Sequence, residues 1–196
     1  MLSVSYSVKI WSFNLNIWKF KKQCQSDFDG GLSRSSIFEK YSKNEMSEKK
    51  LATIIATIKD GTLTKKYRLL NYLLAGVMIL LALVISFSFY EIAKSGEMAV
   101  IAIVSVIVLL FVALIYGVIK NNYQAYLIYA LLTTMKLPTH IDGFGSDLTV
   151  NIIELSIAIF LVFTTWFLKS KLFPYMTIFG GPKKNDDGKY LVALNS

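Results

Sequence analysis

Cysteine and histidine are almost absent from this chain of 196 residues, and this scarcity excludes several kinds of functional site. A single cysteine, Cys24, cannot form a disulfide within the chain or a metal site made of several thiolates. A single histidine, His140, cannot form a multi-histidine metal site. The patterns G-x-S-x-G, G-x-x-x-x-G-K-[ST], H-E-x-x-H and C-x-x-C are also missing. We therefore expect no catalytic residues, no bound metal and no cofactor, and a protein that is not an enzyme.

Charge is missing from two long stretches, residues 69–90 and 98–119. Each stretch has 22 residues, which corresponds to about 33 Å of α-helix. The hydrocarbon core of a bilayer is about 30 Å thick, so both stretches predict transmembrane helices. A third apolar run, residues 150–168, contains one acid, Glu154, near its start, and we predict that it also spans the membrane.

The first 45 residues contain no uninterrupted apolar segment, so the sequence predicts no secretory signal peptide there. Apolar and polar residues alternate over residues 4–20, which is typical of strands and predicts a weak β-hairpin or disorder. Residues 26–36 are rich in Gly, Ser and Asp and predict a linker. Because Met46 then opens a well-patterned segment, our hypothesis is that residues 1–45 are a dispensable extension, translated from an upstream start site.

Residues 47–60 predict an amphipathic helix that precedes the first span. Apolar residues recur at positions i, i+3, i+4 and i+7 on one helical face, namely Leu51, Ile54, Ile55 and Ile58. Four basic residues on or after this helix would lie at the membrane surface: Lys59, Lys65, Lys66 and Arg68. Two interpretations stay open, a helix lying in the headgroup plane and a helix packed against protein.

Residues 123–137 decide the topology, because they are apolar but correspond to only about 22 Å of helix. The chain before residue 69 holds 13 of the 21 Lys and Arg residues, which places the N-terminus in the cytoplasm. If residues 123–137 cross, 19 basic residues lie inside and only Lys94 and Lys136 lie outside. If they do not cross, the tail lysines lie outside and the division is 15 to 6. The charge distribution therefore favours crossing.

The predicted fold is an all-α integral membrane protein, a small up-down bundle of four transmembrane helices preceded by the amphipathic helix. The spans cover about residues 69–90, 98–119, 123–137 and 150–168, and residues 169–196 form a cytoplasmic tail. The alternative is three spans with residues 123–137 as an interfacial or buried helix. The small size and short loops suggest a bacterial inner membrane, with both termini in the cytoplasm.

A few residues within the spans are candidates for function or packing. Glu154 is the single acid within a predicted span, and intramembrane acids are often functional. Two pairs of small residues spaced four apart, Ala82 with Ser86 and Ala113 with Gly117, would let helices approach closely.

The functional expectation is a membrane subunit or assembly factor of a larger complex, of the secretion, conjugation or envelope type. The alternative is a small transporter, channel or holin-like pore. The expected partners are the lipid bilayer and other membrane proteins or further copies of the chain. We attribute the net charge of +8 to lysines on the cytoplasmic side and expect no nucleic-acid binding.

Overall fold

The computed structural model describes residues 17–43, 46–93, 98–142 and 148–194, and every regular element among them is helical. The predicted all-α class is thus confirmed. The chain divides into two compact units. The terminal unit combines both ends of the chain, Met1–Lys59 and Phe173–Ser196, and the central unit is Asp60–Leu172. Most of the predicted N-terminal β-hairpin lies outside the described residues.

The terminal unit begins with a helix over residues 17–29 and continues with α2 (Arg34–Tyr41), where the sequence predicted a linker. The glycines of that segment end the first helix, because Gly31 has a φ of 97° and Leu32 N donates to the carbonyl of Asp27 over 3.1 Å. Ser33 then caps α2, accepting a hydrogen bond from Ser36 N over 3.1 Å. The residues that suggested a flexible linker therefore build a helix–turn–helix corner.

The predicted amphipathic segment forms α3 (Glu48–Ala56), which packs on α2 and on the short 3₁₀ helix η1 (Leu191–Ala193). Its apolar residues Leu51 and Ile55 are buried. The helix ends earlier than predicted. The side chain of Asp60 accepts hydrogen bonds from the backbone N–H groups of Thr62 and Leu63 and so caps the next helix, α4 (Gly61–Lys66). Gly61 is the first residue of α4.

The C-terminal segment is a folded part of the terminal unit. Around Gly188, which has a φ of 78°, Asn185 N donates to the carbonyl of Lys189 over 2.8 Å. Antiparallel bridges join Met176 to Pro182 and Lys184 to Tyr190. The segment predicted as a tail therefore contains turns and bridges, and its helix η1 packs on α2 and α3.

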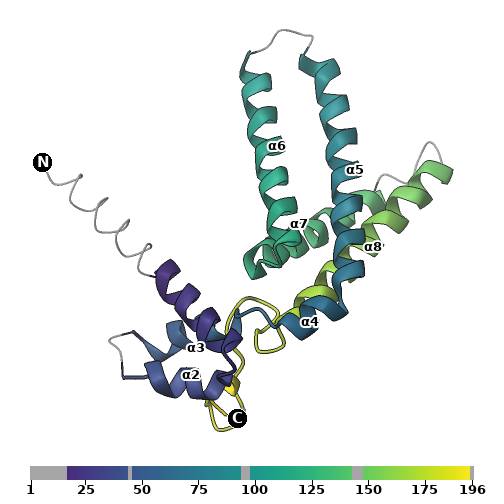
Figure 1. Cartoon of the computed structure of the whole chain (residues 1–196). Helices are drawn as coiled ribbons and strands as arrows, with labels where there is room; N and C mark the ends of the chain where they lie inside the picture. Colours follow the sequence, from purple (N-terminus) through teal and green to yellow (C-terminus); the bar gives the residue numbers. More distant parts are fainter. Residues whose placement is uncertain (1–16, 44–45, 94–97, 143–147, 195–196) are drawn as a thin grey trace, which may run out of the picture. The chain divides into compact units, whose positions relative to one another are not determined.

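The central unit contains two antiparallel helix pairs. The first pair is α5 (Arg68–Ala93) with α6 (Met98–Ile119), and the second is α7 (Tyr123–Asp142) with α8 (Leu148–Leu172). Figure 1 shows α5 and α6 running side by side, while α8 runs obliquely to them. The central unit therefore differs from a bundle in which all four helices are parallel along their length.

Three helical segments are long and apolar enough to cross a membrane: Arg68–Phe87, Ile101–Ile119 and Thr149–Leu172. They match the three runs that the sequence predicted as spans. Helix α7 is not among them, so the structure does not establish a fourth span. It does correct the helix boundary, because α7 continues through Pro138 to Asp142. Proline lacks an N–H group, so the helix lacks one hydrogen bond of its ladder at Pro138.

Candidate functional site

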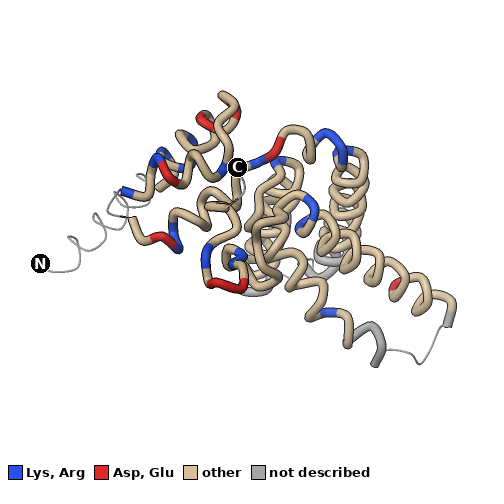
Figure 2. Tube along the Cα trace, turned by 90° about the horizontal axis from the view of Figure 1, so that it is seen from below, with Lys and Arg blue, Asp and Glu red and all other residues tan. Residues whose placement is uncertain are grey.

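One end of the central unit gathers the basic residues of four helices. Tyr67, just before α5, contacts Phe167 near the end of α8, with ring centroids 5.8 Å apart and nearly perpendicular. This contact brings the start of α5 and the end of α8 together, and α4 also packs on α8. We name this end of the unit the basic end, defined by Lys65, Lys66, Arg68, Lys120, Lys169 and Lys171. All of them are exposed except Lys169, which is buried. Figure 2 shows Lys and Arg concentrated at helix ends of the central unit.

Aromatic rings accompany these cations. Lys169 Nζ lies 4.8 Å from the Trp166 ring centroid and 5.6 Å from that of Tyr123. Lys120 lies 5.7 Å from the Tyr116 ring, and Lys171 lies 5.8 Å from the Phe167 ring. Cations over aromatic faces are attracted by the ring quadrupole. The combination is typical of a helix end at a membrane–water interface.

The predicted membrane-surface residues divide between the two units. Lys65, Lys66 and Arg68 are exposed at the basic end of the central unit. Lys59 is exposed in the terminal unit, where its backbone N–H and carbonyl both bond the side chain of Gln25, over 2.9 and 3.0 Å. The apolar face of α3 is buried, which favours the interpretation that this helix packs against protein.

A buried polar network fixes the corner between α6 and α7. Asn71 of α5 donates to the carbonyl of Val118 over 3.1 Å, and Tyr126 of α7 donates to the side chain of Asn71. Asn121, with a φ of 50°, ends α6, and Asn122 caps α7 by accepting a hydrogen bond from Gln124 N over 3.0 Å. Buried polar groups of this kind fix the arrangement of the three helices, because leaving them unpaired is costly.

The predicted small-residue pairs have different surroundings. Gly117 is buried, and a Cβ atom added there would collide with the Cβ of Ala125 on α7. Ala113 is exposed. Ala82 and Ser86 are partly buried on α5, and the Ser86 hydroxyl donates to the carbonyl of Ala82 over 2.7 Å. Of the four, Gly117 therefore has a close helix–helix contact that its lack of a side chain permits.

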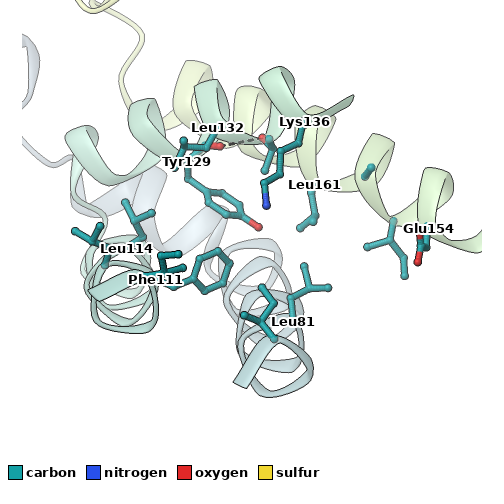
Figure 3. Close-up of a pocket in the computed structure, with 14 residues that line it drawn as sticks. Leu81, Phe111, Leu114, Tyr129, Leu132, Lys136, Glu154 and Leu161 are labelled. Carbon is teal, nitrogen blue, oxygen red and sulfur yellow. Dashed lines mark hydrogen bonds between the residues drawn. The ribbon is translucent and has the colours of Figure 1, made fainter. Parts of the chain in front are cut away.

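A cavity of about 480 Å³ lies among the four long helices of the central unit (Figure 3). Ligand pockets generally occupy about 300–1,000 Å³, so this volume suits a small molecule. The wall from α5 and α6 is entirely apolar and consists of Leu81, Ile85, Ile107, Leu110, Phe111 and Leu114. The wall from α7 and α8 adds Leu132, Ile157, Ala158 and Leu161, and four polar residues: Tyr129, Thr133, Lys136 and Glu154.

The Tyr129 hydroxyl points into this cavity (Figure 3). Its ring packs edge-on against Phe111, with centroids 6.0 Å apart, and only 2% of the residue is exposed. The hydroxyl makes no hydrogen bond to the part of the chain that the structure describes. Because the hydroxyl faces the cavity, it could donate a hydrogen bond to a ligand oxygen there.

Lys136 and Glu154 contribute opposite charges to the cavity. The Lys136 ammonium points toward the cavity interior, and Glu154 lies at one end of the cavity (Figure 3). Sequence analysis identified Glu154 as a candidate functional residue, but it did not predict that Tyr129 and Lys136 line the same cavity. Tyr129 and Lys136 are seven residues apart, which places both on one face of α7. This spacing is the sequence pattern that could have predicted their common location. No group of three or more metal-ligating side chains occurs among the described residues.

Comparison with known protein families, curated proteins and solved structures finds no match for this chain.

Proposed function

We propose that this chain is a four-span protein of a bacterial inner membrane, with both termini in the cytoplasm, and that it acts as a non-catalytic subunit or assembly factor of a larger membrane complex. The observation that carries the topology is the contact of Tyr67 with Phe167. It brings the start of the first predicted span and the end of the last one to the same end of the central unit. An even number of crossings follows if both outer helices span.

The length of α7 supports a fourth span. The helix has 20 residues, which corresponds to about 30 Å and equals the thickness of a bilayer core. Its start lies at the basic end, since Lys169 lies over the ring of Tyr123. The six cations of the basic end would then share the cytoplasmic interface, as the positive-inside rule favours.

The terminal unit supports the role of a complex subunit. Both ends of the chain build it, so it would lie on the cytoplasmic side under the proposed topology. It exposes the large apolar residues Ile178 and Phe179, at 61% and 84%, on the turn after Met176. Exposed apolar side chains grouped in this way often mark a surface for another protein.

Single-cysteine labelling tests the topology. In a Cys24→Ser background, we would introduce Ser95→Cys, Lys120→Cys, Ser146→Cys or Ser196→Cys and treat intact cells with a membrane-impermeant maleimide. Four spans predict labelling at positions 95 and 146 only. Labelling at 196 and protection at 146 would establish three spans and refute the proposed topology.

Crosslinking in native membranes followed by mass spectrometry tests the proposed role. We expect reproducible crosslinks from Lys183 and Lys184, which lie close in sequence to Ile178 and Phe179, to one membrane complex. A variant with Ile178→Ser and Phe179→Ser should lose these crosslinks while keeping the same topology. Isolation of the wild type in mild detergent as a lone monomer, with no crosslinked partner, would contradict the role.

A transporter or pore is the second candidate, because Glu154 and Lys136 line the same cavity. Ion flux into proteoliposomes that disappears in a Glu154→Gln variant would favour this function over that of a subunit. Wild-type flux no greater than that of empty liposomes would exclude it.

A further inference from the structure

Tyr129 brings a hydroxyl group into the largely apolar cavity of the central unit (Figure 3). We propose that this cavity binds an isoprenoid quinone, and that the Tyr129 hydroxyl donates a hydrogen bond to one carbonyl of the quinone ring. The proposal rests on the insertion of α6 in the membrane, which is part of the function proposed above. It depends neither on the number of spans nor on the role in a larger complex.

The Tyr129 side chain is held in place while its hydroxyl faces the cavity. The residue is 2% exposed, and its ring packs edge-on against Phe111, with centroids 6.0 Å apart. The hydroxyl makes no hydrogen bond to the described residues, whereas the Thr133 hydroxyl in the same wall donates to the backbone carbonyls of Tyr129 and Ala130. A phenol has one O–H to donate, so Tyr129 supplies the hydroxyl donor of this wall to a ligand.

The depth of Tyr129 in the membrane narrows the class of ligand. Its ring contacts Phe111 of α6, and α6 contains the apolar segment Ile101–Ile119, which is long enough to cross a bilayer. Phe111 is ten residues after the start of this segment and eight before its end, about 15 Å and 12 Å along the helix. The contact therefore lies near the middle of a hydrocarbon core that is about 30 Å thick.

This depth favours a quinone over an ester lipid. The ester and phosphate groups of a glycerophospholipid lie at the edge of the hydrocarbon core, about 15 Å from its middle, so they would not reach Tyr129. A quinone is uncharged and carries its carbonyl groups on a ring attached to a hydrocarbon chain. Such a ring can enter the apolar core of the bilayer and present an acceptor oxygen there.

The rest of the wall fits a flat ring with a hydrocarbon tail. Every cavity residue from α5 and α6 is aliphatic or aromatic. Phe111 and Tyr129 offer ring surfaces, and aromatic rings pack favourably in offset or edge-on arrangements. Ile107 and Leu110 are also 43% and 61% exposed, so this wall continues onto the outer apolar surface of α6. The isoprenoid chain can leave the cavity toward the lipid along that surface.

The two charged residues of the wall receive no ligand contact in this proposal. Lys136 and Glu154 line the cavity, but both interact with other groups of the chain. Lys136 is seven residues after Tyr129, about 10 Å further along α7. An uncharged ligand fits a site whose charged side chains already have partners.

Native mass spectrometry of the full-length protein in mild detergent tests the proposal with two probes. One probe is a decyl-substituted para-naphthoquinone, and the other is decylnaphthalene, which has the same rings and chain but no carbonyl group. We expect a single quinone adduct. The Kd of decylnaphthalene should be about three- to tenfold higher, because a hydrogen bond between neutral groups is lost.

Variants of the protein isolate the same hydrogen bond from the other side. Tyr129→Phe should raise the Kd of the quinone by the same factor and leave that of decylnaphthalene unchanged, because only the hydroxyl is removed. Tyr116→Phe is the matched control at an exposed tyrosine of α6 outside the cavity, and it should change neither value. Ala158→Leu fills part of the cavity and should weaken both probes, whereas Ala113→Leu on the exposed surface of α6 should weaken neither.

Several outcomes would overturn the proposal. These are equal binding of the two probes by the wild type, equal effects of Tyr129→Phe and Tyr116→Phe, or an Ala158→Leu variant that binds both probes as tightly as the wild type. A phosphatidylglycerol adduct that Tyr129→Phe weakens would identify an ester lipid as the ligand and refute the quinone. Cysteine labelling and crosslinking report on the topology and on the complex separately, so failure of the quinone site is distinguishable from failure of the proposed function.

Discussion

Replacement of Gly117 by alanine tests whether α6 and α7 approach each other as closely as the structure shows. The new Cβ would lie against the Cβ of Ala125, well inside the contact distance of about 3.5–4.0 Å between carbon atoms. Asn122, which caps α7, lies nearby, with its Cβ 3.9 Å from the added atom. The start of α7 must therefore shift away from α6 to accommodate a single methyl group.

Two opposing contributions set the expected magnitude. Alanine is favoured over glycine within a helix by about 1 kcal/mol. Forcing an extra methyl group into a packed contact costs about 1–3 kcal/mol. Gly76 on α5 is the matched control, because a Cβ added there meets nothing within 4 Å. Both variants gain the helix propensity, so the difference between their stabilities isolates the clash, at about 1–3 kcal/mol.

Fluorescence-monitored thermal unfolding of detergent-solubilised protein provides the assay. We expect Gly76→Ala to be as stable as the wild type or slightly more stable. Gly117→Ala should unfold about 2–12 °C below Gly76→Ala, from the usual scaling for chains of this length. The double variant Gly117→Ala with Ala125→Gly should recover most of the loss, because the new Cβ then meets the Cα of residue 125 at 3.8 Å and the Cβ of Asn122 at 3.9 Å, which are ordinary contact distances. Equal melting temperatures for the Gly76 and Gly117 variants, or a double variant no better than Gly117→Ala, would refute the contact.

Three further predictions concern the terminal unit. Burial raises the pKa of the Cys24 thiol to about 11. Maleimide labelling of Cys24 at pH 7.5 should therefore be slow in the folded protein and rapid in denaturant. Rapid labelling of the folded protein would show that the thiol is accessible. Hydrogen bonds from Lys40 and Tyr41, each 2.8 Å long, hold the pKa of Asp27 below its ordinary value of about 3.9. The ionised Asp27 therefore stabilises the fold above its ordinary pKa, and this stability is lost as the pH falls through the lowered pKa. Asp27→Asn should flatten the profile of stability against pH between pH 5 and pH 2. A profile parallel to that of the wild type would contradict the hydrogen bonds of Asp27 with Lys40 and Tyr41. Deletion of residues 1–45 should accelerate limited proteolysis within α3, and unchanged cleavage would support the hypothesis that this segment is dispensable.

The long helices of the central unit were predictable because one property, uninterrupted apolar length, decides them. Helix α6 begins and ends at the residues expected from its uncharged run, Met98 and Ile119. The end of α7 was not predictable in the same way. Pro138 reads as a stop signal, but a proline near a helix end removes only one hydrogen bond, and the helix continues for one more turn.

The helices before residue 46 were missed for a different reason. Alternation over a few residues suggested a strand, although Phe20, Cys24 and Phe28 recur every four residues, as on one face of a helix. The cavity residues were missed because they come from four helices, and no local pattern reports which faces will meet. Glu154 was found because an acid in an apolar run is conspicuous, whereas Tyr129 lies among other tyrosines at a helix start.

The segment before Met46 also bears on the two interpretations of α3. Arg34 donates to the carbonyl of Ile58 over 3.2 Å, and the Gln25 amide bonds both backbone groups of Lys59. These contacts hold the chain just after α3 in place, while α2 covers the apolar face of that helix. A chain that began at Met46 would lack all of them and would expose Leu51 and Ile55. Burial against protein and attachment to a membrane surface are thus alternatives for the same apolar face, and the presence of residues 17–43 favours burial.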